Sequence, residues 1–520
     1  MPSFQAFIPV LAPLVMLAAA VFAGRHHGDP RRVQRFAEAS GVAAVVVALA
    51  TLLELLLGGR QTSPLIGVAG LGFSARIDAL SVSMLLLVSV VGLVVLRFSR
   101  NYLAGDPGQA RFSGGLTLTL GAVMALVIAG NLAQLLLAFI ATSLALHLVF
   151  YPDRPKAVMA ARKKFLVARL ADLALAASLA ILWLRFGTAD IAAIAEAARA
   201  APAGAADSAL IAAALLLALA AMLKSAQFPS HGWLPEIVET PTPVSALLHA
   251  GIINAGGFLI LRFADVMLMA PPALHALALV GGFTALFASA VMLTQPAVKV
   301  QLAWSTIAQM GFMLFQCGIG AFAIALLHII AHSLYKAHAF LSSGTAVDEV
   351  RAASGAGAGA PATSWRIVLA GTAAVVLAAL AWMLLPPATD PASLTLAGIF
   401  GLGLALLALP AAEGRGMSGS LAVALGTALA ASLAYALLHA AANRLFAAEL
   451  PVASLQGGAA AAILVLAFAS FALLALLQLT AHRWIATPRG RAARIHLANG
   501  LYVDAVADRF LTGPQPSPQS

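Results

Sequence analysis

Long apolar segments alternate with short polar ones along the whole chain. A helix that crosses a bilayer needs roughly 20 predominantly apolar residues. The pattern therefore predicts an all-α polytopic membrane protein with about fifteen transmembrane helices, connected by short loops. The predicted spans are 4–23, 36–57, 77–98, 114–130, 131–150, 162–186, 207–227, 243–264, 273–293, 299–318, 320–343, 366–386, 393–411, 419–443 and 459–480.

The composition supports lipid as the main solvent of this chain. Of the 520 residues, 62% are hydrophobic and 10% are charged, whereas a soluble domain has roughly 45–50% apolar and about 25% charged residues. The single cysteine, Cys317, excludes a disulfide or an iron–sulfur cluster within the chain. Most of the 30 lysines and arginines fall in alternate loops. The positive-inside rule then predicts an N-terminus outside and a cytoplasmic C-terminus in a bacterial inner membrane.

This topology assigns individual charges to loops. It places Lys163 and Lys164 in a cytoplasmic loop and Arg262 in an outer loop. We expect Glu236, Glu239 and Lys299 to face the cytoplasm or a partner protein.

The end of the chain differs from the rest. Residues 487–511 mix charged and apolar side chains, which predicts an amphipathic helix along the cytoplasmic surface or against a partner. An ordinary solvated helix is the alternative. Residues 352–361 read as a small-residue linker, and 512–520 as a disordered tail.

A lysine precedes a predicted helix break. Lys224 follows the apolar run 212–223, and a charge within a span costs at least a few kcal/mol, so it requires a reason. Prolines remove backbone donors and break helices. Interrupted helices with a charge at the break are typical of transporters, although Lys224 could instead extend its amine toward the membrane surface from a helix end. The prolines that predict this break are Pro229, Pro235, Pro241 and Pro243.

Two further spans carry charged or titratable groups. Arg169 and Asp172 lie three residues apart, so they share a helix face and can form a structural pair. Alternatively, Asp172 tunes the charge state of Lys224 from a neighbouring helix. His249 is a candidate next stop for a proton, because histidine titrates near neutral pH. A buried histidine with satisfied hydrogen bonds is the alternative.

The eleventh predicted span carries a row of titratable side chains. His328, His332 and Lys336 follow at intervals of four residues and share one face, while His338 points elsewhere. Such a row indicates a proton relay, and hydrogen bonding between helices is the alternative. The two histidines have a spacing that zinc could use, but no Glu or Cys ligand lies near them in sequence.

The sequence resembles a known family at these residues. KSAQFPSHGWLPEIVETPTPVSALLHAGIINAGGF, KVQLAWSTIAQMGFM, LLHIIAHSLYKAHAFLSSG and RIDALSVSMLLLVSVVGLVV resemble the proton-pumping membrane subunits of respiratory complex I and of Mrp-type cation antiporters. The resemblance implies inverted repeats with broken helices. It implies a division into 1–113, 114–269 (first repeat), 270–411 (second repeat), 412–486, 487–511 and 512–520. It also implies ion translocation by Lys224, His249, Asp172, Arg169, His328, His332 and Lys336.

Three features depart from that family. Ile140 stands where the family has a glutamate that pairs with the lysine of the seventh helix. The family also has a lysine on its twelfth helix, and the matching span 367–385 contains none. The long lateral helix is also absent. These departures leave Asp172 as the candidate partner of Lys224.

The departures, with SLALHLVFYPDRPKAVMAARKKFLVARLAD and YKAHAFLSSG, resemble the DabB family of membrane subunits. The resemblance implies H+ or Na+ flow coupled to CO2 hydration by a zinc-containing partner, DabA, so that bicarbonate accumulates. This chain itself would then be no enzyme and hold no cofactor. The alternatives are a proton-pumping subunit of an NADH-quinone oxidoreductase or Mrp complex, and a membrane anchor without transport. No dinucleotide-binding GxGxxG follows a strand, so no NADH site is expected.

Overall fold

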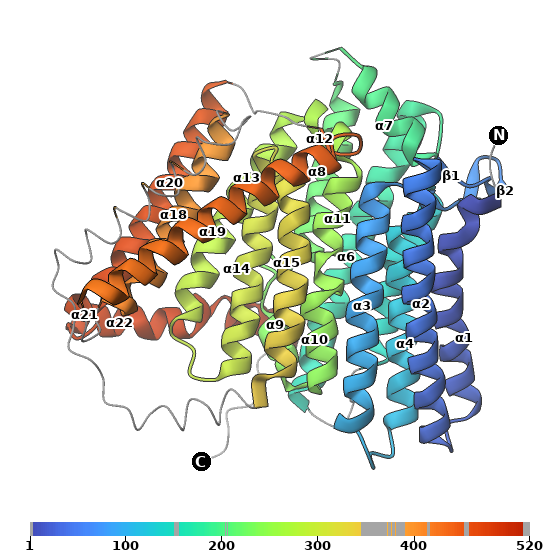
Figure 1. The fold of residues 1–520 in the computed structure, drawn as a ribbon, viewed down its shortest axis with the longest axis horizontal. Coiled ribbons are helices and arrows are strands. Elements are labelled where there is room, and N and C mark those ends of the chain that lie inside the picture. Colours follow the sequence, from blue (N-terminus) through green and yellow to red (C-terminus); the bar gives the residue numbers. More distant parts are fainter. Residues whose placement is uncertain are drawn as a thin grey trace.

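The computed structural model describes residues 4–149, 155–202, 204, 206–344, 390–412, 417–451 and 457–512, with positions 372, 376 and 380. The described chain is a bundle of helices whose N-terminal helices lie at one side and whose C-terminal helices lie at the other (Figure 1). The predicted linker 352–361 falls outside the described residues, as do the predicted span 366–386 apart from positions 372, 376 and 380 and the predicted tail apart from position 512.

The N-terminal side combines long helices with two small hairpins. Strand β1 pairs antiparallel with β4, with Gln61 opposite Ile77, and β2 pairs antiparallel with β3, with Ile66 opposite Phe73. The elements of this side are η1 (Phe4–Val10), α1 (Leu11–Arg25), α2 (Pro30–Gly58), β1 (Gln61–Thr62), β2 (Ile66–Val68), β3 (Leu71–Phe73), β4 (Arg76–Ile77), α3 (Ala79–Tyr102) and α4 (Gln109–Val127).

Two of the central predicted spans are interrupted or end early in the structure. The predicted span 243–264 is divided at Gly251, and the predicted span 207–227 ends at Lys224. The central elements are α5 (Leu132–His147), α6 (Pro155–Phe186), α7 (Ile191–Ala200), α8 (Ser208–Lys224), α9 (Trp233–Glu236), η2 (Ile237–Glu239), α10 (Thr242–Ala250), η3 (Ile252–Asn254), α11 (Ala255–Arg262), α12 (Ala264–Met269), α13 (Pro271–Met292), α14 (Val298–Gly318) and α15 (Phe322–Leu341).

The C-terminal helices complete the bundle. Helix α19 crosses in front of α15 and reaches toward α12 in the view of Figure 1. The predicted amphipathic segment 487–511 forms two helices with a turn between them. The elements are α18 (Pro391–Ala412), α19 (Met417–Leu445), α20 (Gly458–Leu479), α21 (Ala481–Trp484), α22 (Pro488–Ala498), η4 (Gly500–Tyr502) and α23 (Val503–Thr512).

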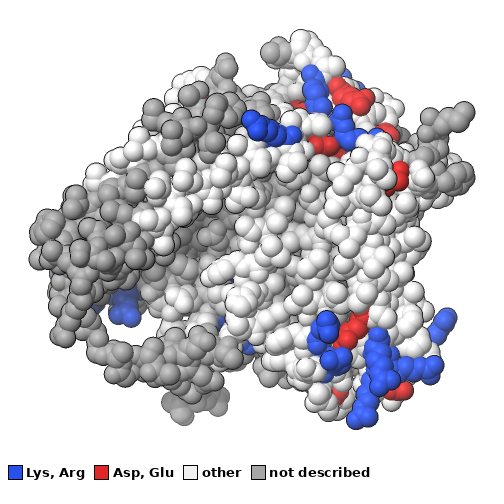
Figure 2. Space-filling view, viewed as in Figure 1, with Lys and Arg blue, Asp and Glu red and all other residues white. Residues whose placement is uncertain are grey.

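The apolar surface of the molecule matches a membrane environment. Among the described residues, nine helices are long and apolar enough to cross a bilayer, and three shorter helices are also apolar. Figure 2 shows charged side chains gathered at two opposite ends of the visible face, with a broad uncharged band between them. The all-α membrane fold is confirmed, while the count of about fifteen spans stays a prediction.

A buried ion pair joins distant parts of the chain. Arg262 donates to the Asp78 carboxylate over 2.6 Å and to the Ser81 hydroxyl over 2.5 Å, and only 5% of Arg262 is exposed. Arg76 reaches the same carboxylate. The expectation that Arg262 lies in an outer loop is therefore wrong. Its position at the end of an apolar run resembles a loop in sequence, but the hairpin segment supplies a buried carboxylate.

Helices α13 and α14 approach closely through glycines. A β-carbon on Gly281 would lie 2.6 Å from the Gly311 carbonyl oxygen, and one on Gly318 would lie 2.3 Å from the Ala278 nitrogen. The obstructing atoms belong to the backbone, so neither clash can be relieved by turning a side chain. Small residues at helix interfaces are the usual basis of tight packing in membranes. Both helices also line the large cavity described below.

We predict that Gly311→Ala destabilises the protein by about 1–3 kcal/mol, because its methyl group would overlap the backbone of α13. Gly282→Ala is the matched control, since its β-carbon would meet Phe315 at an ordinary 3.5 Å. Thermal unfolding in detergent should show a lower midpoint for the first variant and an unchanged midpoint for the second. Equal midpoints for both variants would contradict this account of the interface.

Candidate functional site

The end of α8 places a lysine inside the bundle. The chain turns at Ala226, which adopts a positive φ of 50°, and Pro229 follows. Pro235 lies inside the short helix α9, while Pro241 caps α10 and Pro243 lies in its first turn, where a missing N–H costs nothing. The predicted break after Lys224 is present in the structure.

Lys224 is held by uncharged groups of α5. Its ammonium nitrogen donates to the Ser143 hydroxyl over 2.6 Å, and to the Thr142 hydroxyl and the Phe139 carbonyl over 3.1 Å each. The same nitrogen lies 3.9 Å from the centre of the Phe139 ring, a cation–π contact. Only 7% of Lys224 is exposed. Snorkelling to the surface therefore does not describe this side chain.

The predicted acidic partner of Lys224 is engaged elsewhere. Asp172 forms an ion pair with Arg169 over 2.7 Å, as their spacing predicts. No ion pair joins Asp172 to Lys224 within the described residues, although Asp172 interacts electrostatically with both Lys224 and Lys164. Lys224 instead bonds to oxygen atoms of three residues that lie close to Ile140 on α5, namely Phe139, Thr142 and Ser143. The role of Asp172 in translocation stays a prediction.

Sequence reasoning missed a second buried amine. Lys164 is 6% exposed and donates to the Ser143 carbonyl oxygen over 2.8 Å. Its neighbour Lys163 is also buried, so the expectation that both lie in a cytoplasmic loop is wrong. The cause is that α6 begins before the apolar run and carries both side chains into the bundle. The only sequence signal is their position at the edge of that run.

A small cavity separates the two amines. It measures about 20 Å³ and is lined by Lys164, Lys224, Ser143, Trp233 and Leu248, among others. A space of this size admits about one water molecule. Most of the wall is apolar, and Ser143 and the two lysines supply the polar atoms that a buried water requires. The arrangement can therefore connect two amines through one mobile hydrogen-bonded group.

His249 lies on α10, beside the cavity residue Leu248. The histidine is fully buried, and its ring stacks on Phe340 of α15 with 4.4 Å between ring centres. Neither ring nitrogen has a hydrogen-bond partner within the described residues. Buried polar atoms without partners are costly, so they mark positions that require an explanation other than stability.

Helix α15 carries the predicted row of titratable groups. The ring centres of His328 and His332 lie 6.1 Å apart, and His328 Nδ1 is 2.9 Å from the Gln316 side-chain oxygen. Lys336 is fully buried and donates to the Leu302 carbonyl over 3.0 Å. The row faces the bundle, as the spacing predicts. Within the described residues, no group of three or more His, Cys, Asp or Glu side chains could hold a metal ion.

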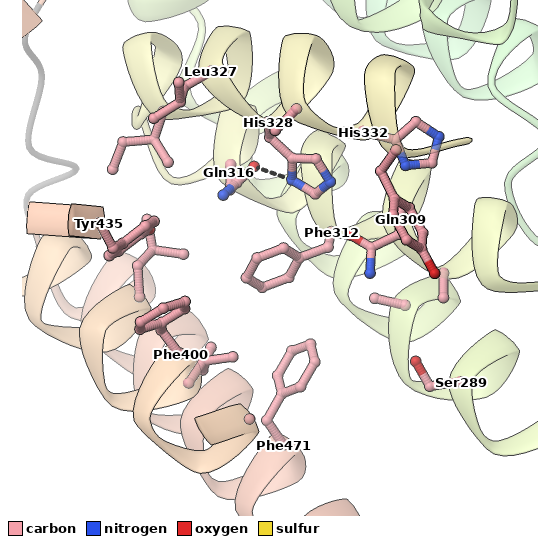
Figure 3. Close-up of a pocket in the computed structure, with 18 of the residues that line it drawn as sticks. Ser289, Gln309, Phe312, Gln316, Leu327, His328, His332, Phe400, Tyr435 and Phe471 are labelled. Atoms are coloured by element: carbon pink, nitrogen blue, oxygen red, sulfur yellow. Dashed lines mark hydrogen bonds between the residues drawn. The ribbon is translucent and has the colours of Figure 1, made fainter. Parts of the chain in front are cut away.

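A large cavity opens beside this row. It has a volume of about 620 Å³ and lies between α13–α15 on one side and α18–α20 on the other (Figure 3). His328 and His332 line it with Gln309, Gln316 and Ser289. The sequence did not single out these amides and the hydroxyl, because isolated polar residues in apolar helices are common. The cavity leaves open space beside the α15 histidines, although most of its wall is apolar.

The predicted residues thus form two groups. Lys224, Arg169 and Asp172 belong to the first, while His249 joins the α15 residues, since it interacts electrostatically with Lys336 and His332. Helix α10 lies between the groups and contributes Leu248 to one and His249 to the other.

Another buried histidine lies within the break itself. His231 is 0% exposed and packs against the rings of Phe228, Phe287 and Trp304. The backbone of Pro229 is the polar group that its ring meets. In the sequence, its place between Pro229 and Pro235 could have indicated that it belongs to the break.

The residues expected to face a partner have contacts within the chain. Lys299 donates to the Thr242 hydroxyl over 2.9 Å, and Glu236 forms an ion pair with Lys163 over 2.5 Å. The side chain of Glu239 lies outside the described part. Contact with a partner protein stays a prediction for all three.

We predict that Lys224→Met keeps or raises the midpoint of thermal unfolding, because a similar apolar side chain removes the cost of burying an amine. Ser143→Ala, in contrast, should destabilise the protein by about 1–3 kcal/mol, since it leaves the Lys224 ammonium short of an acceptor. Unfolding of purified protein in detergent measures both. A clear loss of stability in Lys224→Met would mean that the lysine serves the fold.

Comparisons with known proteins agree on one family. The family described as "NADH:quinone oxidoreductase/Mrp antiporter, TM" matches residues 129–389, and "NADH-Ubiquinone oxidoreductase (complex I), chain 5 N-terminus" matches residues 66–113. The chain is 38% identical over 511 residues to "Probable inorganic carbon transporter subunit DabB2" of Halothiobacillus neapolitanus, covering 96% of this chain and 92% of that relative.

More distant relatives share parts of the chain or its fold. NADH-quinone oxidoreductase subunit L of Escherichia coli is 36% identical over 319 residues, which cover 59% of this chain and 51% of that subunit. A chain of the Mrp complex from Dietzia sp. superposes with a TM-score of 0.65 at 24% identity, over 97% of this chain and 59% of that chain. The second likeness concerns the fold alone. The chain therefore belongs to the NADH:quinone oxidoreductase/Mrp antiporter family of membrane subunits, within which it groups with the DabB-type subunits.

Proposed function

We propose that this chain is the cation-conducting subunit of an energy-coupled inorganic carbon uptake complex in the bacterial inner membrane. The relatives named as inorganic carbon transporter subunits support the carbon part of the proposal. The cation is H+ or Na+, and the chain is oriented with its N-terminus outside and its C-terminus in the cytoplasm.

The burial of Lys224 beside a second amine is the observation that carries the proposal. The lysine lies in the bundle interior, its ammonium nitrogen bonded to uncharged oxygens, and it shares a small cavity with Lys164. Intramembrane ionisable residues are rare and mark ion pathways. Two amines that share one cavity repel each other when both are charged, so they favour the loss of one proton. This arrangement suits a group that loads and releases protons in turn.

The path we propose runs from Lys224 past α10 to α15. His249 accepts or donates the proton between the two groups, and Lys336 and His332 continue the path. His332 and His328 then line the large cavity. Arg169 forms an ion pair with Asp172 in the structure, and in this proposal the pair is the resting state. Release of that pair would let the Asp172 carboxylate stabilise a charged Lys224. Arg169 and Asp172 would thereby determine when Lys224 binds its proton.

The carbon chemistry belongs to a partner in this proposal. A DabA-like zinc protein hydrates CO2, and ion flow through this chain makes that hydration effectively one-way. The zinc ion lies in the partner, and this chain contributes no ligand to it.

Exchange of relay residues tests conduction. We predict that Lys224→Ala and His332→Ala each reduce uptake of labelled inorganic carbon at least tenfold in cells that express the chain with its partner. His338→Ala is the matched control, because that histidine is exposed on the same helix as His332. Blots and co-purification should show an unchanged complex. Full uptake by Lys224→Ala would favour the anchor hypothesis.

The identity of the partner is tested separately. We predict that the chain co-purifies from its native membrane with one large protein that contains zinc, measurable by mass spectrometry and metal analysis. Uptake should fall on addition of an uncoupler or on removal of sodium, according to the ion used. Co-purification with a multi-subunit redox arm or with Mrp-type subunits would instead support the oxidoreductase or antiporter alternative.

A further inference from the structure

The C-terminal segment is docked onto the helix break. Gln295, in the turn between α13 and α14, donates to the Ala498 carbonyl at the end of α22 over 3.2 Å. The chain then turns through Gly500, Leu501 and Tyr502, which all have positive φ, and Gly500 lies against the ring of Trp304. This turn directs α23 toward α9 and the beginning of α6.

One buried lysine connects α23 to the break. Lys163 of α6 forms ion pairs with both Glu236 of α9 and Asp508 of α23. The Lys163 side chain is 7% exposed, whereas Glu236 and Asp508 are 32% and 38% exposed. A partly buried pair of this kind is screened less than a surface pair, and loss of one partner leaves a charge without compensation.

A second carboxylate of α23 lies against the break. The Asp504 carboxylate occupies the space next to Gly232, where any β-carbon would collide with it. The next residue, Trp233, lines the Lys224 cavity, as does Lys164, the neighbour of Lys163. At the start of α9 and on α6, therefore, one residue lines the cavity and its neighbour contacts α23.

We propose that α23 is a lid on the Lys224 cavity, docked when Asp504 is protonated and loosened when Asp504 is ionised. The charged groups that face Asp504 are Glu236 of α9, Lys163 of α6 and Asp508 of α23 itself. Two of these three carry negative charge, so an ionised Asp504 adds repulsion at the point where the helix docks. The docking of α23 does not depend on whether the chain conducts ions. An effect of the lid on ion flow rests on the proposed function.

The direction of the pH effect follows from the environment of Asp504. Burial, reinforced by Glu236 and Asp508 and opposed by Lys163, raises the pKa of Asp504 to about 6. Burial also raises the pKa of Glu236, the neighbouring carboxyl of α9. The pKa of Asp504 is higher when α23 is docked than when it is undocked, so Asp504 takes up a proton as the helix docks. The added stability is complete below the ordinary pKa of about 3.9 and is lost as the pH rises through about 6.

Hydrogen exchange of the backbone amides tests the lid directly. An isolated helix as short as α23 is marginal in water, so its amides exchange rapidly once it undocks. In purified full-length protein in nanodiscs, we expect residues 503–512 to exchange at least tenfold more slowly at pH 5 than at pH 8, after correction for intrinsic exchange rates.

Three variants separate the contributions. Asp504→Asn mimics the protonated acid and should stay protected at both pH values. Asp508→Asn removes an anchor of Lys163 and should lose protection at both. Arg509→Gln, an exposed residue of the same helix, should behave as wild type. Equal corrected protection of wild-type α23 at pH 5 and pH 8, or a pH response that survives in Asp504→Asn, would overturn the proposal.

The experiment also separates the lid from the transport proposal. Exchange is measured on the purified chain, so its result does not depend on whether the chain conducts ions. A pH-dependent lid together with full carbon uptake by Lys224→Ala would leave the lid standing and remove the transport proposal. Protection of α23 that does not change with pH, together with loss of carbon uptake in Lys224→Ala, would remove the lid and leave the transport proposal standing.

Discussion

The cost of placing ionisable groups in an apolar bundle governs this structure. Lys224 has no carboxylate contact among the described residues, and two hydroxyls, one carbonyl and the Phe139 ring surround its ammonium instead. Such ligands stabilise a charge less than an anion would, so the proton on Lys224 is held loosely by comparison with a salt bridge. Helix α8 ends at this lysine, and the short helix α9 follows it.

Adjacent residues connect the parts of the site. Leu248 and His249 link the Lys224 cavity to α15, while Lys163 and Lys164, like Gly232 and Trp233, link it to α23. Neighbours in sequence share one peptide link, so a shift of the backbone at one residue also displaces the next. A change at α23 or at α15 therefore has a short physical route to Lys224. The Arg262–Asp78 pair and the glycine contacts of α13 with α14 fix the surrounding helices.

The sequence predicted what local patterns encode. Hydropathy gave the all-α membrane class, the prolines gave the break after Lys224, and spacing gave the Arg169–Asp172 pair and the row on α15. The sequence alone could not predict which charged side chains near helix ends are buried, because a charge at the edge of an apolar run looks like a loop residue. Lys164 and Arg262 are the examples, since partners far away in sequence bury them. The docking of α23 and the cavity beside His328 likewise depend on tertiary packing.

The central claim is that these buried groups carry a cation whose movement drives carbon uptake. The most direct measurement is bicarbonate accumulation in proteoliposomes that contain the chain with its partner, under an imposed proton or sodium gradient. The account predicts that accumulation requires one of these gradients, and that the gradient collapses faster while CO2 is supplied. Accumulation to the same level without any ion gradient would contradict it.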